Sequence, residues 1–515
     1  MSPSLTLELG ARFERVGRPS EVNHLVDLGY PTDNYVEPRF GFAYAPVWSQ
    51  GLLGKLTGGQ GKSVLRGGFG LFHGRIFQSI FSQVSLAVRY NPPNGATVTV
   101  SNPDMSVANP LGAYRFTPGP PTTQVILAVA DPNLHMPYTE QWNLTFERAL
   151  PSRSAISLSY AGNRGVGFLQ YNGMNRAQFP QVSSVPLNYS GTNFTGVLFD
   201  KIDPNLFDPN PPPGYISLAQ PRTNQRRPDG RYSIVLQVSN NEWTYYNAMQ
   251  AVYTKQLSHG LTLHGSYTWS KNIDTGSEAT FVGAGDTNFA ISDQQTAKSL
   301  RGLSRLDQPH RFVLVYTYDL PIFKTENGAL GRVLGGWQVN GISTFAAGNP
   351  VTAVLGYDLN GDGIAGDRPW LTNLSVFGKS FDNARINPST GRQYSMDAIP
   401  TSAFFPTAAN AGAWPWYPGT GYVASAGRNI FRLTGQNNFD VAFVKNTRLF
   451  GREHPHQLQF RAEMFNLFNR VQFDVPNLTL VDTGVAGYRI NPNFGRISAQ
   501  RNSPRNMQMM LRYQF

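Results

Sequence analysis

The last nine residues of the chain alternate between large apolar and polar side chains. One face of this segment carries Met507, Met509, Leu511, Tyr513 and Phe515. The opposite face carries Gln508, Arg512 and Gln514. A period of two predicts a strand with one apolar and one polar face. An aromatic residue at the end of such a strand is typical of a barrel whose apolar face meets lipid.

The same alternation recurs along the chain and predicts about twelve strands. They are expected at 5–14, 39–44, 63–73, 141–147, 156–160, 246–257, 261–269, 312–320, 337–345, 439–443, 458–464 and 507–515. Polar positions on these strands that would face inward are Arg12, Arg39, Glu147, Arg461 and Glu463. Tryptophans near strand ends, which suit an interfacial aromatic girdle, are Trp48, Trp142, Trp269 and Trp337.

Short and long connections alternate between these strands. The short series comprises 150–153, 258–260 and 451–455, with two moderate members near 49–61 and 321–333. The long series comprises 75–138, 164–243, 274–307, 350–435 and 473–503. Structureless loops of this length are unusual in a compact soluble domain. A transmembrane antiparallel β-barrel places short turns on the periplasmic side and long loops outside. The all-β fold class predicted here is therefore such a barrel.

Composition supports strands rather than helices. The chain has 12% aromatic and 15% charged residues, with 51 Gly, 37 Pro and no Cys. No window holds the ~20 apolar residues that a membrane-spanning helix needs. The net charge is +11, but the basic residues are dispersed, which disfavours nucleic-acid binding. Residues 1–9 lack the pattern of a secretory signal peptide, so either the protein is cytosolic or the chain is the C-terminal part of something longer.

Several sequence motifs are similar to those of a known protein family. The main one is Leu458–Arg470, which reads LQFRAEMFNLFNR and is followed by Phe494–Ile497 and the aromatic-ended last strand. Weaker pieces are Tyr267–Lys271, Gly335–Gln338 and Gly348–Pro350. Together they resemble the end of TonB-dependent outer-membrane receptors, and more narrowly the Oar-like type that carries a carboxypeptidase-regulatory-like domain.

The resemblance implies a barrel of about 22 strands, an N-terminal plug and a TonB box. About ten of those strands, the plug, the TonB box and the signal peptide have no counterpart in residues 1–515, so this span is expected to be the C-terminal portion of the barrel domain. It also implies energised binding and uptake of a large nutrient at the cell outer membrane. The implied partners are outer-membrane lipid, an unknown nutrient ligand and, through the missing N-terminal parts, the TonB complex. The barrel-assembly machinery would read Tyr513 and Phe515.

One loop has the residue types of a calcium site. Oxygen ligands recur at Asp358, Asn360 and Asp362, and Asp367 follows. Pro369 stands where a calcium loop carries its bidentate Glu. The alternative is a polar turn at the start of a loop. A second, weaker metal candidate is the His454 and His456 pair, for which a solvated turn is the competing interpretation.

No motif predicts an enzyme, because Ser, His and Asp do not fall in a nucleophile-elbow or zinc-helix pattern. Glycines such as Gly67, Gly68 and Gly70 are expected to make room on a crowded inner wall. Two other functions fit the alternation as well. One is a self-contained pore or translocator of about twelve strands. The other is a secreted soluble β-rich binding module.

Overall fold

The computed structural model describes most of each predicted strand and part of each long connection. The described residues are 4–17, 22, 32–48, 50–76, 125–176, 187–189, 192–194, 201–202, 215–216, 227–229, 232–277, 300–322, 328–356, 368–371, 385–386, 393–394, 404–405, 426–450, 456–482 and 489–515.

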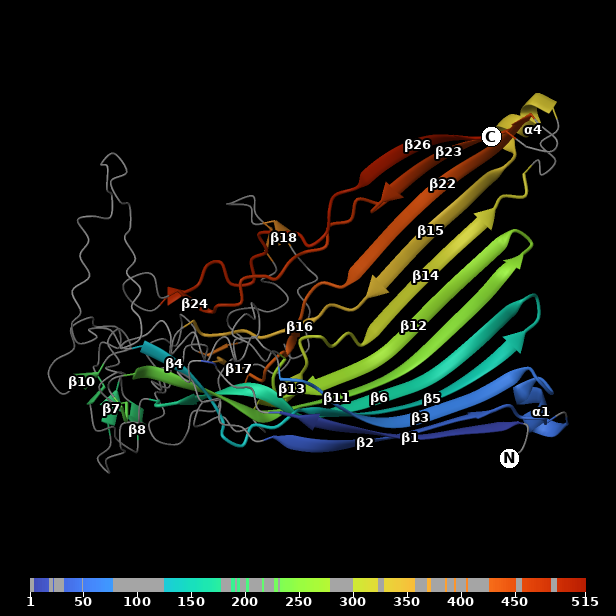
Figure 1. The fold of residues 1–515 in the computed structure, drawn as a ribbon. Helices are drawn as coiled ribbons and strands as arrows, with labels where there is room; N and C mark the ends of the chain where they lie inside the picture. The colour runs from blue at the N-terminus through green and yellow to red at the C-terminus, as the bar shows by residue number, and fades with distance from the viewer. Residues whose placement is uncertain are drawn as a thin grey trace.

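One antiparallel sheet dominates the fold, and twelve of its strands follow one another on a single path (Figure 1). They are β1 (Leu5–Val16), β2 (Asp33–Tyr44), β3 (Ser63–His73), β5 (Tyr138–Leu150), β6 (Ser154–Met174), β11 (Tyr232–Ser258), β12 (Leu261–Asp274), β14 (His310–Asp319), β15 (Trp337–Ala346), β22 (Gln436–Phe450), β23 (His456–Phe465) and β26 (Asn506–Gln514). All twelve predicted strands are present, in the predicted order. The all-β antiparallel fold class is confirmed.

Two strands extend beyond their predicted ends. β6 continues to Met174 and β11 begins at Tyr232, inside the connection that was expected to be a loop. The ladder between them shifts register near Ser239 and Glu242. Such an irregularity interrupts the alternation on which the prediction rested, because the side chains beyond it change faces.

Smaller strands lie within the long connections. β4 (Val125–Ala130) runs parallel to β11, and β13 (Gly302–Leu303) pairs with β12. Two-stranded ladders join β7 (Leu187–Tyr189) to β8 (Thr192–Phe194), β9 (Lys201–Ile202) to β10 (Tyr215–Ile216), β16 (Pro350–Val351) to β21 (Phe431–Arg432), β17 (Trp370–Leu371) to β20 (Phe404–Phe405), β18 (Arg385–Ile386) to β19 (Gln393–Tyr394), and β24 (Val481–Asp482) to β25 (Arg489–Ile490).

Tight turns close the short connections. His259 and Gly260 both have positive φ, 55° and 77°, in a two-residue hairpin loop between β11 and β12. Positive φ at both central residues is the geometry whose twist matches two antiparallel strands. The connection between β5 and β6 likewise has positive φ at Ser152 and Arg153. Each of these turns therefore brings consecutive strands side by side.

The moderate connections each contain a short helix that the alternation did not predict. They are α1 (Gly51–Thr57) and α4 (Gly328–Leu334). Both lie at the same end of the strands as the first and last described residues, whereas β4, β13, β16 and β24 lie at the other end (Figure 1). Within the described ranges, no helix is long and apolar enough to cross a membrane.

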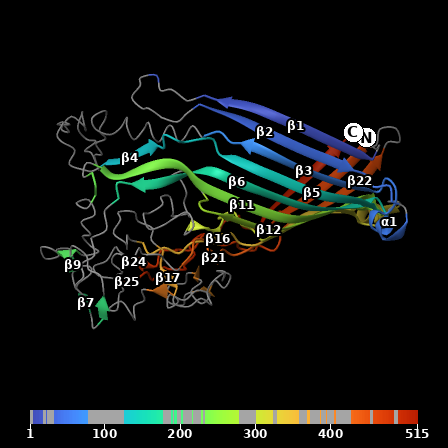
Figure 2. The ribbon, with the colours of Figure 1, turned by 90° about the horizontal axis from the view of Figure 1, so that it is seen from below.

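The sheet curves but does not close on itself. Among the described strands, β1 pairs with β2 alone and β26 pairs with β23 alone. Figure 1 shows β1 and β26 at the two edges of the curved sheet, and Figure 2 shows the same sheet from below. This arrangement differs from the closed twelve-stranded pore, in which these two strands would pair with each other.

The apolar core lies beyond the sheet rather than on one of its faces. Large side chains that are almost fully buried sit in the long connections or in the extensions of β6 and β11: Leu134, Leu169, Leu236, Leu300, Phe431 and Phe494. By contrast, Leu9 is 79% exposed and Leu511 is 68% exposed on the apolar face of the sheet. A soluble protein would cover that face, since monomers rarely expose large contiguous apolar patches.

Candidate functional site

Polar side chains gather on one face of the ladder and form a continuous wall. Thr145 of β5 lies opposite Arg66 of β3 and Ser159 of β6, and its hydroxyl donates a 2.9 Å hydrogen bond to Ser159 Oγ. Its neighbour Leu144 points to the other face, opposite Gly67 and Tyr160. Residues that are paired across neighbouring strands therefore point to the same face, so the sheet as a whole has one polar and one apolar face.

Ion pairs line this polar wall. Arg66 lies 3.4 Å from Glu147, and Arg39 lies 3.2 Å from Glu37. Further pairs join Arg12 to Glu14 and Arg461 to Glu463. The five charged positions predicted to face inward all belong to this wall. Because the charges are paired and partly exposed, they present a polar surface to water or to another polar structure rather than to hydrocarbon.

The opposite face is apolar and carries aromatic residues toward both strand ends. Trp142 and Trp269 lie toward the long connections, whereas Trp337 and Trp48 lie toward the short turns. Trp142 contacts Tyr245 with a ring-centre distance of 6.2 Å. This distribution agrees with the predicted aromatic girdle.

Rings on this face cover glycines in the neighbouring strand. Trp142 lies opposite Gly162, where a Cβ would be 2.4 Å from the Trp142 Nε1 atom. Phe42 covers Gly67 in the same way, and Tyr316 covers Gly341. The prediction that Gly67 makes room on an inner wall was therefore wrong, because Gly67 makes room for a ring on the apolar face. Gly68 and Gly70 do lie on the polar side.

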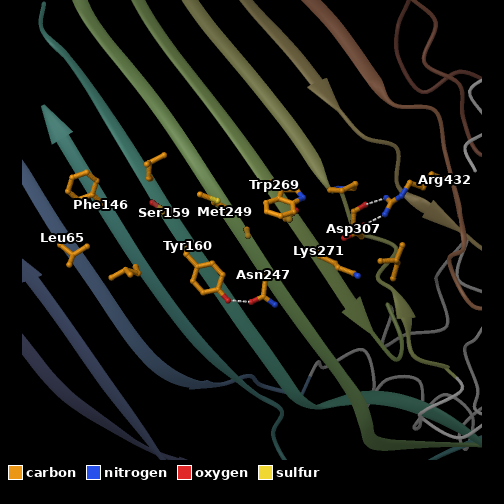
Figure 3. A pocket seen from close by; sticks show the side chains of 16 residues that line it. Leu65, Phe146, Ser159, Tyr160, Asn247, Met249, Trp269, Lys271, Asp307 and Arg432 are labelled. Carbon is orange, nitrogen blue, oxygen red and sulfur yellow. Dashed lines mark hydrogen bonds and ion pairs between the residues drawn. The ribbon is translucent and has the colours of Figure 1, made fainter. Parts of the chain in front are cut away.

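A groove of about 740 Å³ runs diagonally across this apolar face, from β3 to β12 (Figure 3). Its lining includes Leu65, Leu144, Phe146, Leu158, Tyr160, Met249 and Trp269. Such a surface favours contact with hydrocarbon, since burial of apolar area is its main source of binding free energy.

The end of the groove nearest the long connections is polar. Arg432 donates to Asp307 Oδ2 at 2.5 Å, and Tyr160 donates to Asn247 at 2.5 Å (Figure 3). Lys271 lies beside them and is exposed. The groove thus combines a long apolar floor with basic groups at a single end.

At the end of β12, a buried arginine connects three segments that are distant in the chain. The Arg428 guanidinium lies against the Asp274 carboxylate and also donates to Ser277 Oγ and to the Leu300 carbonyl oxygen, each at 3.0 Å. The next residue, Asn429, donates from its side chain to the Leu303 carbonyl oxygen at 2.7 Å. These bonds hold the long connections against the end of β12.

Where the structure describes them, the site residues that the sequence predicted do not lie in the groove or at Arg428. Asp358, Asn360, Asp362 and Asp367, the calcium candidates, lie outside the described residues, as does His454. Over the part of the chain that the structure describes, no group of three or more His, Cys, Asp or Glu could hold a metal ion. Tyr513 and Phe515 lie at the short-turn end, where their rings are 5.8 Å apart and both pack near His456.

Comparisons with known proteins agree with this geometry. A family model described as "Outer membrane beta barrel domain" matches residues 23–508. The chain belongs to this family. The outer membrane barrel assignment accounts for both faces of the sheet: the apolar face meets lipid, and the polar wall faces the lumen. It also places the protein in the Gram-negative outer membrane. Barrels of this kind carry their short turns on the periplasmic side and their long loops outside.

Solved structures of low similarity were also found. The outer membrane transporter YddB from Escherichia coli is 8% identical, with a TM-score of 0.42 over 93% of this chain and 41% of that one. A mutant of the ferric enterobactin receptor from Pseudomonas aeruginosa is 9% identical, with a TM-score of 0.40 over 99% and 42%. The FrpB iron transporter from Neisseria meningitidis is 9% identical, with a TM-score of 0.36 over 99% and 44%.

This outer membrane barrel chain spans less than half the length of each of those solved structures. No curated protein matches it. Besides the helices α1 and α4, sequence reasoning missed the Arg428 contacts and the groove in this barrel. Neither has a local signal, because each joins residues that are far apart in the chain. The ring-over-glycine pairs were detectable in principle once strands were aligned in register.

Proposed function

We propose that this chain is the wall of an outer-membrane receptor that takes up a large nutrient with energy supplied through TonB. The observation that carries the proposal is the division of one ladder into an apolar face and an ion-paired polar wall, with the described parts of the long connections gathered at one end of the strands. A ligand would first meet the long connections and then pass along the polar wall. The chain needs no covalent chemistry for this task.

We further propose that residues 1–515 form the C-terminal portion of a larger, Oar-like barrel. The open edges of β1 and β26 support this extension. Within a bilayer, unpaired backbone groups at a sheet edge are costly, so both edges require partner strands. Further strands of the same barrel, enclosing a plug, would satisfy them. The ion pairs of the polar wall would then face that plug or the water around it.

The experiment compares the native strain with two deletion strains, one lacking the gene for this protein and the other lacking tonB. Uptake is measured for a panel of labelled ferric siderophores, oligosaccharides and peptides. We expect at least one substrate whose uptake falls in both strains. A substrate whose uptake falls in the first strain and stays normal in the tonB strain would contradict energised transport. It would favour a passive pore instead.

A further inference from the structure

The two helices of the periplasmic turns expose apolar side chains that no strand covers in the structure. On α1 these are Leu52, Leu53 and Leu56, which are 74%, 50% and 54% exposed. On α4 they are Leu330, Val333 and Leu334, which are 69%, 65% and 44% exposed. In each helix the three residues fall on one side, because their spacing matches a helical turn.

The sheet holds α1 in a defined orientation. Thr57, which is buried, donates to the Leu53 carbonyl oxygen at 2.9 Å, and Ser63 at the start of β3 donates to the Thr57 carbonyl oxygen at 2.6 Å. Arg148 of β5 donates to the Leu56 carbonyl oxygen at 2.9 Å. These bonds face Gly54 and Thr57 toward the protein, so the leucines on the other side point away from it.

Tryptophans connect both helices to the lipid-facing side of the barrel. Trp48, just before α1, packs edge-on against Tyr44 at 5.9 Å, and Tyr44 lies on the apolar face opposite Leu65. Just after α4, Trp337 lies on the same face of the sheet and donates from Nε1 to the Val333 carbonyl oxygen at 3.3 Å. The exposed apolar side chains are therefore continuous with the surface that meets lipid.

Charge on the two helices has a single sign. Each helix carries one exposed basic residue in its last turn, Lys55 in α1 and Arg332 in α4, and neither has an acidic residue in its first turn. A helix with an apolar side, flanking aromatic residues and basic groups is suited to lie in a bilayer interface. Basic groups at that depth attract anionic head groups.

We propose that α1 and α4 are interfacial anchors that bind anionic phospholipid of the periplasmic leaflet. Their apolar side chains enter the boundary between head groups and acyl chains, and Lys55 and Arg332 contact the head-group phosphates. Two anchors on turns that are several strands apart would fix the depth and tilt of the barrel. This role depends on the outer-membrane location and not on which solute the receptor carries.

Spin labels can test this directly, because residues 1–515 contain no cysteine that would compete with an introduced one. The full protein that carries this chain is prepared with Leu53→Cys or Leu330→Cys, and with Gln60→Cys or His259→Cys, which are exposed positions of turns at the same end of the strands, as controls. Each variant is reconstituted in vesicles of phosphatidylethanolamine and phosphatidylglycerol. The nitroxide is then exposed either to oxygen, which concentrates in lipid, or to a water-soluble nickel chelate.

We expect the ratio of oxygen to nickel collisions to be several-fold higher at positions 53 and 330 than at their controls. Equal ratios would overturn the proposal. Shielding from both reagents in isolated outer membranes, but not in vesicles, would also overturn it, because a protein would then cover the helices. If Leu53→Cys or Leu330→Cys fails to insert, Leu56→Cys and Val333→Cys probe the same two surfaces.

The preference for anionic lipid is measured separately. Replacing phosphatidylglycerol with phosphatidylcholine should reduce the collision ratio at position 53, and Lys55→Gln should reduce it in the presence of phosphatidylglycerol. If neither the change of lipid nor Lys55→Gln alters the collision ratio, the contact between Lys55 and the head groups is contradicted.

Discussion

The guanidinium of Arg428 is buried against the carboxylate of Asp274, the last residue of β12, although 154 positions separate them in the chain. Both side chains are almost completely inaccessible to water. Ser277 donates a 2.8 Å hydrogen bond to the second Asp274 oxygen. The pair thus joins the connection that precedes β22 to the outer end of β12.

Arg428→Met should destabilise the barrel by roughly 3–5 kcal/mol, because it leaves the Asp274 carboxylate buried without its counter-charge. The free energy of unfolding in guanidinium measures the loss. The matched control is Arg12→Gln, which breaks an exposed ion pair with Glu14 and should cost about 0–1 kcal/mol. The double variant Asp274→Leu with Arg428→Met should recover part of the stability. Equal effects of Arg428→Met and Arg12→Gln would contradict the burial argument.

Gly162→Val should destabilise the protein by about 1–3 kcal/mol, because the new side chain would displace the Trp142 ring. A change in tryptophan fluorescence should accompany the loss. Gly10→Val is the control, since a Cβ at Gly10 meets nothing within 4 Å. If both substitutions lower stability equally, the backbone freedom of glycine is responsible and the ring contact is not.

Leu144→Arg and Thr145→Arg test which face meets lipid. A charge at Leu144 would enter hydrocarbon and cost roughly 2–4 kcal/mol near the bilayer midplane. The adjacent Thr145 lies on the polar wall, so its variant should lose only the hydrogen bond to Ser159. Unfolding of both variants in vesicles gives the comparison. A larger loss at Thr145 than at Leu144 would reverse the assignment of the two faces.

Phe515→Ala should lower the amount of protein inserted in the outer membrane, because the assembly machinery would read the terminal aromatic. Quantitative blotting of outer-membrane fractions measures it. Leu511→Ala on the same face of β26 removes apolar area without touching the terminal residue, so it should insert nearly normally. Normal insertion of Phe515→Ala would refute the signal.

Calcium binding remains a prediction from the sequence of residues 358–367. Calorimetric titration of the full protein at about millimolar calcium should release heat, and the double substitution Asp358→Asn with Asp362→Asn should abolish it. Asp474→Asn serves as control, because Asp474 lies outside the candidate loop and its carboxylate accepts a hydrogen bond from the neighbouring Val475 amide. Absence of heat from the unmodified protein would exclude the site.

The sequence by itself determined the strands, their order and their two faces. Alternation is a local property, so Leu144 and Thr145 could be assigned to opposite faces without knowing their partners. The alternation of short and long connections likewise predicted that the short turns lie at one end of the strands and the long connections at the other. Hydrophobic periodicity could not predict α1 and α4, because seven residues make too few turns to separate a helix from a loop.

Only the tertiary structure decided which distant residues meet. Trp142 covers Gly162 because the register of β5 and β6 places them opposite each other, and register depends on two strands at once. Arg428 reaches Asp274 because β14 and β15 cross the sheet in opposite directions before the chain returns to the end of β12. The open edges of β1 and β26 are likewise a property of the whole sheet. Contacts of this kind depend on chain closure over long separations, which no window of sequence contains.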